Sequence, residues 1–418
     1  MGAEVSSQLL TNPRPLFIAA GVLGFLGILP GMPHIAFLTL AAGVAGVGYL
    51  SREMAKNVVE TEDARNAEKK AEDTKQPEKI ESLLKVDALA LEVGYGLIGM
   101  VSAGDSFLNR IREIRRQTAV ELGIIVPSVH VTDNLQLAPR EYAILLKGEK
   151  IAQGEIYPEG YLAIDPGVIR EKIDGIETTD PSFGMPAVWI RRNEDRDRAV
   201  SAGYTVVDPT TVVCTHLSEI IKRYAFELLG RQETRELLDS LAETHPKTVE
   251  EASPKVLSLG EVQRVLQNLL RERVPIRDLA TILESITDVG VVTRDVNALT
   301  EAARASLART ISSSLANESG ELSVLTLDPR LETQVAERLG LLGSQSGQAL
   351  EPEFGKQLLE KIETACRAAV MSQPIVLCSS MVRPHLRKLT ERFLPELVVI
   401  AHGEVASNVR LISMGSVS

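Results

Sequence analysis

The chain has 418 residues, which is too many for a single hydrophobic core and predicts several domains of about 100 residues each. Its net charge of −11, and the lack of any Lys/Arg-rich stretch interleaved with aromatic residues, argue against a nucleic-acid partner. The cysteines Cys214, Cys366 and Cys378 lack the spacing of metal ligands, which argues against a zinc motif and fits a reducing compartment.

Two apolar stretches without a charged residue, 15–30 and 34–50, stand near the start of the chain and are separated by a Gly-Met-Pro turn. They predict a two-helix transmembrane hairpin within residues 1–51, each arm being near the short end of the roughly 17–25 residues that span a bilayer. A signal peptide is the weaker alternative, because the second apolar arm follows at once. Basic residues on both sides place the two ends of the hairpin in the cytoplasm: Arg14, Arg52 and Lys56.

Residues 52–86 follow as a linker in which acidic and basic side chains alternate with few apolar ones. Pro77 interrupts this run, so the linker is expected to be solvated and at most partly helical. Three apolar residues, Ile80, Leu83 and Leu84, mark its distal end. They are expected either to anchor on another protein surface or to pack against the domain that follows.

A glycine motif, Gly94-Tyr95-Gly96-Leu97-Ile98-Gly99, follows a predicted strand at 87–93. It matches the G-x-G-x-x-G fingerprint of dinucleotide sites, in which a helix opens within the glycine turn and its first amides meet a pyrophosphate. Here the next helix is expected only near residue 105 or 106, so the fingerprint geometry fails. A membrane-tethered nucleotide-binding enzyme built on Gly94, Gly96 and Gly99 therefore remains only an alternative.

Other catalytic patterns in the sequence are equally weak. Cys214 and His216 lie two positions apart on a predicted helix, where side chains do not face each other, so they do not form a nucleophile and its base. The other histidines are isolated, and neither an H-E-x-x-H motif nor a G-x-x-x-x-G-K-[ST] loop occurs. We therefore expect no enzyme activity, no cofactor and no metal.

Short strand-like segments separated by turn residues fill the next part of the chain, at 128–131, 142–147, 150–156 and 161–164. They predict an α/β region that contains antiparallel pairs.

The segment 177–217 carries the most informative pattern. The run Asp180-Pro181-Ser182-Phe183-Gly184 predicts a turn, because proline presets φ and glycine tolerates a positive φ, and a strand follows at 187–190. A second strand at 204–207 leads into Asp208-Pro209, which is typical of an N-cap and a first helical position.

Two interpretations are open for this segment. Phe183 either caps a local core or is an exposed aromatic that binds a partner. Asp180 is expected to accept backbone N–H groups in the turn, unless it contacts the partner. Thr215, near the start of the helix, is by default a solvated or back-bonding hydroxyl.

Helices dominate residues 231–307, where Ser258 and Glu261 form a capping box and one further helix is expected over about 296–316. Residues 308–418 alternate strands with helices and predict a last α/β domain. The strands are expected at 321–327, 375–378 and 397–401, and the helices at 351–371 and 384–393.

Five motifs taken together, LEVGYGLI, PSVHVTDNLQLAPREY, TTDPSFG, GYTVVDPTTVVCTHL and VPIRDLATILE, resemble the flagellar and injectisome export-pore family. The resemblance covers essentially the whole chain. It implies a large cytosolic region that docks export chaperones with their cargo, in a ring of subunits below the secretion pore. The docking residues of the family fall on Asp180, Phe183 and Thr215, and the linker contact with a neighbouring subunit falls on Ile80, Leu83 and Leu84.

With this resemblance as a guide, the cytosolic region is expected to be mixed α/β with four subdomains. These are a first α/β domain, 87–157 plus 208–230; an inserted α/β lobe, 158–207; a helical domain, 231–307; and a C-terminal α/β domain, 308–418. Members of the family carry further transmembrane helices and a signature loop before such a hairpin. This chain resembles a member shortened at its start, so an ion-conducting role cannot be placed on it.

The resemblance favours a flagellar export-gate subunit of the bacterial inner membrane over its injectisome counterpart. The partners it implies are flagellar export chaperones with cargo, other export-apparatus subunits, the export ATPase complex, further copies of the chain and the lipid bilayer.

Overall fold

The computed structural model describes residues 86–102, 106–191, 193–341, 350–369 and 373–418, together with residues 21, 25, 35, 39–46 and 49. The chain divides into two units, residues 1–85 and 86–418. The described residues of the first unit are helical, and the Thr39 hydroxyl donates to the Ile35 carbonyl at 2.9 Å. No helix formed by described residues is both long and apolar enough to cross a membrane.

Most of the predicted hairpin lies outside the described residues, as does the linker from residue 52 to residue 85. The structure therefore says nothing about Ile80, Leu83 or Leu84.

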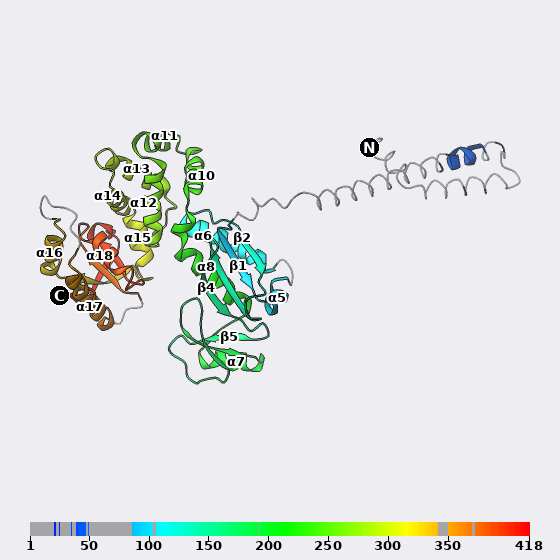
Figure 1. The fold of residues 1–418 in the computed structure, drawn as a ribbon, viewed down its shortest axis with the longest axis horizontal. Helices are drawn as coiled ribbons and strands as arrows, with labels where there is room; N and C mark the ends of the chain where they lie inside the picture. The colour runs from blue at the N-terminus through cyan, green and yellow to red at the C-terminus, as the bar shows by residue number, and fades with distance from the viewer. Residues whose placement is uncertain are drawn as a thin grey trace. The chain divides into compact units, whose positions relative to one another are not determined.

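The second unit begins with a four-stranded sheet in the order β2-β1-β3-β4 (Figure 1). β1 is parallel to β2 and antiparallel to β3, and β3 and β4 form a hairpin. In β1 every second side chain, from Leu89 to Val93, is buried, as expected for a strand with one face on a core. Helices α6 and α8 pack against each other and contribute Phe107 and Leu217 to this core. The bounds are β1 Leu89–Val93, α5 Ile98–Ser102, α6 Ser106–Leu122, β2 Val129–Asp133, β3 Glu141–Leu146, β4 Glu149–Glu155 and α8 Pro209–Arg223.

A second sheet, in the order β6-β7-β5-β8, lies between β4 and α8 in the sequence and has only antiparallel pairs. Leu162 of β5 pairs with Trp189 of β7 on one side and with Val207 of β8 on the other. α8 packs against β5, which joins this sheet to the first one. The bounds are β5 Tyr161–Ile164, β6 Ile176–Thr179, β7 Pro186–Ile190, α7 Asn193–Ala202 and β8 Thr205–Val207.

A group of helices follows, and several of the longer ones begin at a polar residue whose side chain caps them. The side chains of Ser258, Asp278 and Asp295 accept N–H groups in the first turns of α12, α13 and α14. The bounds are α9 Ala225–Leu228, α10 Arg231–Ala242, α11 Pro246–Glu250, the kinked η2 Glu251–Val256, α12 Leu259–Arg271, α13 Leu279–Gly290, α14 Val296–Ser306 and α15 Ala308–Leu315.

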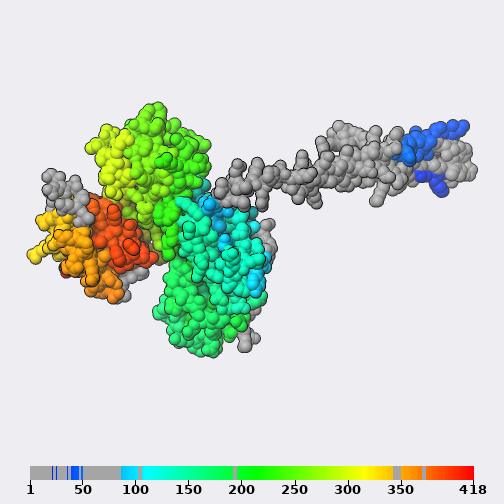
Figure 2. Space-filling view, viewed as in Figure 1, coloured from blue at the N-terminus to red at the C-terminus, as the bar shows by residue number. Residues whose placement is uncertain are grey.

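The last part is a parallel sheet in the order β11-β10-β9-β12, packed with α16, α17 and α18 around one core (Figure 1). Figure 2 shows the described residues of this part, in orange and red, gathered in one region. All four residues of β10 are buried, as is usual in a parallel strand covered on both faces. The bounds are β9 Glu321–Leu327, α16 Pro329–Arg338, α17 Pro352–Ala368, β10 Ile375–Cys378, α18 Arg383–Thr390, β11 Val398–Ala401, η3 His402–Glu404 and β12 Arg410–Val417.

An ion-pair cluster joins the helical group to the parallel sheet. Arg304 of α14 makes two hydrogen bonds of 2.7 Å to Glu404, and a third, of 3.2 Å, to Glu272. Arg383 at the start of α18 donates to Glu272 at 2.6 Å and also binds Glu301. Burial alone would raise the pKa of Glu272, but Arg304 and Arg383 lower it below its ordinary value. Because both guanidinium groups are 98% or more inaccessible, this cluster fixes the two parts to each other.

The predicted elements agree with the observed ones in part. The strands expected at 321–327 and 375–378 are confirmed as β9 and β10. The single helix expected over 296–316 is wrong, because the backbone leaves the helix at Leu307 (φ −90°, ψ 13°) and α15 starts again after it. Two strands, β6 and β12, were not predicted. Both lie at edges of their sheets, and β12 is exposed over most of its length, so its residues lack a clear alternation.

Candidate functional site

The predicted turn at Asp180 is closed by a set of short hydrogen bonds. The Asp180 amide donates to the Met185 carbonyl at 2.8 Å, and the Gly184 amide donates to the Asp180 carbonyl at 2.9 Å. The Asp180 carboxylate accepts the Phe183 amide at 2.8 Å, and the residue is 3% exposed. Gly184 has φ +71°, a conformation that glycine adopts without strain. The carboxylate is therefore used inside the turn.

Phe183 projects from this turn with 58% of its surface exposed, although Ser182 before it is buried. The interpretation in which Phe183 caps a local core does not fit this exposure. Phe183 is thus a large, exposed aromatic side chain on a turn whose backbone is held at three points.

The start of α8 is held by Asp208, whose carboxylate accepts the Thr211 amide at 3.0 Å. Burial tends to raise the pKa of Asp208, but the hydrogen bonds from Thr211 and the Arg110 guanidinium lower it on balance. The N-cap and proline start were thus correctly predicted from Asp208-Pro209. Thr215 lies further along α8 and is partly exposed between the buried residues Cys214 and His216.

A buried pair, Tyr142 and His216, lies behind Thr215. The Tyr142 hydroxyl is 2.7 Å from His216 Nδ1, and the two rings meet edge to face. Burial lowers the pKa of His216 to about 4, and the negative charge of Asp180 offsets part of this effect. Burial, and then Asp180, raise the pKa of Tyr142. His216 is therefore neutral at neutral pH, and its Nδ1 shares one hydrogen bond with the Tyr142 hydroxyl.

The negative charge of Asp180 acts on both groups, so the Asp180 carboxylate lies near the buried Tyr142–His216 pair. That Asp180, Phe183 and Thr215 form one docking surface stays a prediction. Sequence reasoning missed the Tyr142–His216 pair. The available signal was a histidine on the apolar face of α8, but nothing local linked it to a tyrosine 74 positions earlier.

The glycine motif packs against the chain instead of cradling a phosphate. The Gly96 amide donates to the Pro139 carbonyl at 2.9 Å, and the Gly94 amide donates to the Glu141 carbonyl at 2.8 Å. A Cβ on Gly94 would lie 2.0 Å from the Ala138 carbonyl oxygen. These glycines thus permit a close approach of two backbone segments.

One part of the earlier expectation about this motif is wrong. A short helix that was not expected, α5, begins at Ile98 directly after the glycine turn, whereas the helix expected near residue 105 or 106 is confirmed as α6. The dinucleotide interpretation still fails, because the amides of Gly94 and Gly96 are already bonded to carbonyl groups. The cavity beside the motif, of about 760 Å³, is lined by acidic residues, Glu159 and Asp208, as well as by Arg191, so its charges do not favour a phosphate.

Other reactive groups in the described part of the chain are poorly placed for chemistry. Burial raises the pKa of the Cys214 thiol to about 11, so it stays protonated beside His216 at neutral pH. The described residues contain no group of three or more His, Cys, Asp and Glu side chains that could hold a metal ion.

Comparisons with known proteins agree with the motifs. The model of the FHIPEP family matches residues 1–410. The flagellar biosynthesis protein FlhA of Bacillus subtilis (strain 168) is 39% identical over 423 residues, covering 100% of this chain and 62% of that protein. FlhA of Escherichia coli (strain K12) is also 39% identical, covering 98% of this chain and 58% of that protein. The chain thus spans about three-fifths of the length of these relatives.

Solved structures share the fold of the second unit. The structure of the Chlamydia pneumoniae CdsV protein is 26% identical with a TM-score of 0.71, covering 80% of this chain and 98% of that one. The cryo-EM structure of nonameric EPEC SctV-C, at 22% identity and a TM-score of 0.65, covers 80% and 99% and supports the fold alone. The mixed α/β architecture and the resemblance seen in the motifs are both confirmed. The chain belongs to the FHIPEP family.

Proposed function

We propose that this chain is a component of the flagellar protein-export gate that docks chaperone–cargo complexes on the surface formed by the Asp180 turn and Thr215. The observation that carries the proposal is the exposure of Phe183 on a rigid turn. Membership of the FHIPEP family and 39% identity to flagellar biosynthesis proteins support the flagellar setting over the injectisome one.

The three docking residues act differently in this proposal. Phe183 is the anchor that inserts into an apolar pocket of the chaperone. Thr215 contributes to the opposite wall of the docking surface. Asp180 was expected to orient a polar group of the chaperone, but its carboxylate is buried and bound to the Phe183 amide. We therefore assign it the role of holding Phe183 in place.

We further propose the partition expected from the sequence, with a transmembrane hairpin at 1–51, a linker at 52–86 and four cytosolic subdomains. The hairpin is supported by apolar side chains of the first unit that are more than half exposed, as lipid-facing residues would be: Phe25, Ile35 and Leu40. The subdomains 87–157 plus 208–230, 158–207 and 308–418 are supported by one sheet each, and 231–307 by its helices.

Assembly into a ring at the bacterial inner membrane completes the proposal. Structures of related cytosolic regions include a nonameric SctV-C and a complex of CdsV with CdsO. We propose that this chain also forms a ring, in which Ile80, Leu83 and Leu84 contact a neighbouring subunit. The other export-apparatus subunits and the export ATPase complex would then meet the ring. Binding, without catalysis, is supported by the protonated Cys214 and the occupied glycine amides.

A pull-down of a chaperone–cargo complex with variants of the full chain tests the docking surface. Phe183→Ala is expected to weaken binding by about 2 kcal/mol or more without changing the melting temperature, as for an exposed hot-spot aromatic. Asp180→Ala is expected to weaken both binding and the turn, because the Phe183 amide loses its acceptor.

Phe393→Ala is the matched control, since Phe393 is 64% exposed and belongs to another part of the fold. It is expected to bind as the parent does. Normal binding by Phe183→Ala, or equal loss in both phenylalanine variants, would remove the docking assignment.

A further inference from the structure

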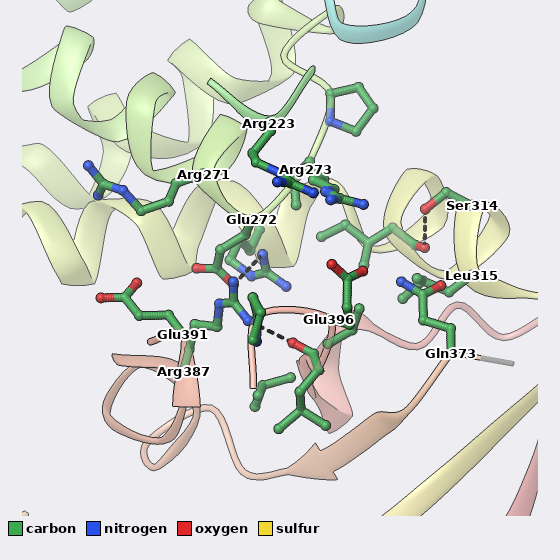
Figure 3. A pocket seen from close by; sticks show the side chains of 18 residues that line it. Arg223, Arg271, Glu272, Arg273, Ser314, Leu315, Gln373, Arg387, Glu391 and Glu396 are labelled. Atoms are coloured by element: carbon green, nitrogen blue, oxygen red, sulfur yellow. Dashed lines mark hydrogen bonds and ion pairs between the residues drawn. The ribbon is translucent and has the colours of Figure 1, made fainter. Parts of the chain in front are cut away.

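A cavity of about 470 Å³ lies where the ends of α8 and α12 meet α15 and the approach to β11. Its volume is in the range of ordinary ligand sites. Figure 3 shows Arg223 and Arg273 on one wall, Glu396 facing them, and Arg387 on the floor. None of the residues of the Asp180 turn lines this cavity.

Two of the wall cations have no carboxylate partner among the described residues. Arg223 is the last residue of α8, and Arg273 follows the end of α12. The dipole of α8 favours a cation at its end, which accounts for the position of Arg223 alone. No described carboxylate forms an ion pair with either side chain, so both are free to bind an anion.

Arg273 also has an unusual backbone. Its φ of +57° is left-handed, and the turn is held by bonds of 2.9 Å from the Arg273 and Val274 amides to the Leu270 and Leu269 carbonyls. Glycine would occupy this position without strain. An arginine kept in a conformation that costs about 1 kcal/mol is typical of a residue held for its side chain.

The floor contains a cation with an unsatisfied donor. Arg387 Nη1 donates to the Leu397 carbonyl at 2.6 Å, but Arg387 Nε is buried without any acceptor. Burial lowers the pKa of Arg387, and the negative charges of Glu272 and Glu391 offset part of this effect. A buried donor without a partner is rare in folded proteins, but a ligand in the cavity cannot reach an atom that is closed to solvent.

The remaining lining decides which class of anion fits. The partly exposed Leu315 and the nearly buried Ile311 and Leu397 line the cavity beside the arginines. Glu396 and Glu391 line the opposite side and would repel an inorganic polyanion. A peptide satisfies all three features, since its carboxylates bind arginine, its N–H groups donate to glutamate and an aliphatic side chain covers the apolar surface.

We propose that this cavity binds an acidic peptide segment of an export partner, with carboxylates on Arg223 and Arg273 and an aliphatic side chain against Ile311 and Leu315. The peptide site is separate from the Phe183 surface, so one partner could contact both or two partners could bind at once. The four subdomains need not move for the peptide to enter, because the arginine wall is exposed.

The test uses the purified full chain and a fluorescein-labelled octapeptide with two leucines flanked by aspartates and glutamates. Fluorescence anisotropy is expected to show binding that weakens as salt is added. A matched peptide with asparagine and glutamine in place of the acids is expected to bind roughly tenfold more weakly. The double variant Arg223→Glu/Arg273→Glu is expected to lose at least about tenfold, and Leu315→Ala a few-fold.

Arg330→Glu is the charge-matched control, since Arg330 is exposed on α16, and Phe183→Ala is the control for the other surface. Both are expected to bind the peptide as the parent does, so failure here leaves the docking proposal intact. Equal binding of the acidic and amide peptides would overturn the site. So would equal competition by inorganic phosphate, or a change of sedimentation in Arg223→Glu/Arg273→Glu without peptide, which would identify a second copy as the occupant.

Discussion

The Asp180 turn and the ion-pair cluster at Arg304 and Arg383 both bury charged groups, but they satisfy them differently. The Asp180 carboxylate is paired with the Phe183 amide of its own turn, and the Phe183 side chain beside it is exposed. The cluster pairs two guanidinium groups with three carboxylates from distant segments, and its arginines expose almost nothing. A local pairing shapes a surface, whereas a long-range pairing joins two parts of the fold.

The substitution with the largest expected effect removes one arginine of the long-range ion-pair cluster. Arg383→Ala would leave Glu272 and Glu301 buried with too little positive charge, and is expected to lower the free energy of unfolding by about 3–5 kcal/mol. Urea denaturation measures this loss. Arg367→Ala, which removes the exposed pair of Arg367 with Glu363 on α17, is the control and should cost about 0.5 kcal/mol or less. Similar losses in both variants would show that the cluster does not hold the junction.

The second prediction concerns pH and the pair behind the Asp180 turn. His216 has a pKa of about 4 in the folded chain against 6.5 ordinarily, so the unfolded chain binds the proton more readily. The contribution of neutral His216 to the free energy of unfolding is therefore fully present above pH 6.5. It is lost as pH falls towards 4, and the loss is about 3 kcal/mol at most. Denaturation curves across this range measure the slope. His216→Gln is expected to be less stable at pH 7 and less sensitive to pH below it; an unchanged slope would contradict the assignment.

The substitution with the smallest expected effect tests the backbone geometry of the Asp180 turn. Gly184→Ala places a Cβ in open space but at φ +71°, so the expected cost is purely conformational, about 1 kcal/mol. Gly99→Ala in α5 also meets open space, but at an ordinary φ, and is expected to be neutral or stabilising. Thermal melting of the two variants measures the difference. A Gly184→Ala variant as stable as Gly99→Ala would mean that the turn is not held in the conformation described.

Local features of this fold were predictable because their causes lie within a few residues. The turn at Asp180, the N-cap at Asp208 and the buried strand β10 each follow from neighbouring residue types. Other contacts join residues that are far apart in the sequence: Tyr142 and His216 are 74 positions apart, and Arg383 and Glu272 are 111 apart. No periodicity in the sequence predicts such contacts. The glycine motif is an intermediate case, since its pattern was visible but its partner, Pro139, was not.

The strands that carry the chain into and out of the second sheet, β5 and β8, are hydrogen-bonded neighbours, with Leu162 paired to Val207. The segment between them thus leaves and rejoins the rest of the fold at nearly one point, as tolerated domain insertions do. Recombination between genes of related proteins could exchange this segment as a block without rethreading the chain. Because the exchanged block would carry Phe183, such an event would replace the exposed aromatic residue of the Asp180 turn in one step while leaving the ion-pair junction untouched.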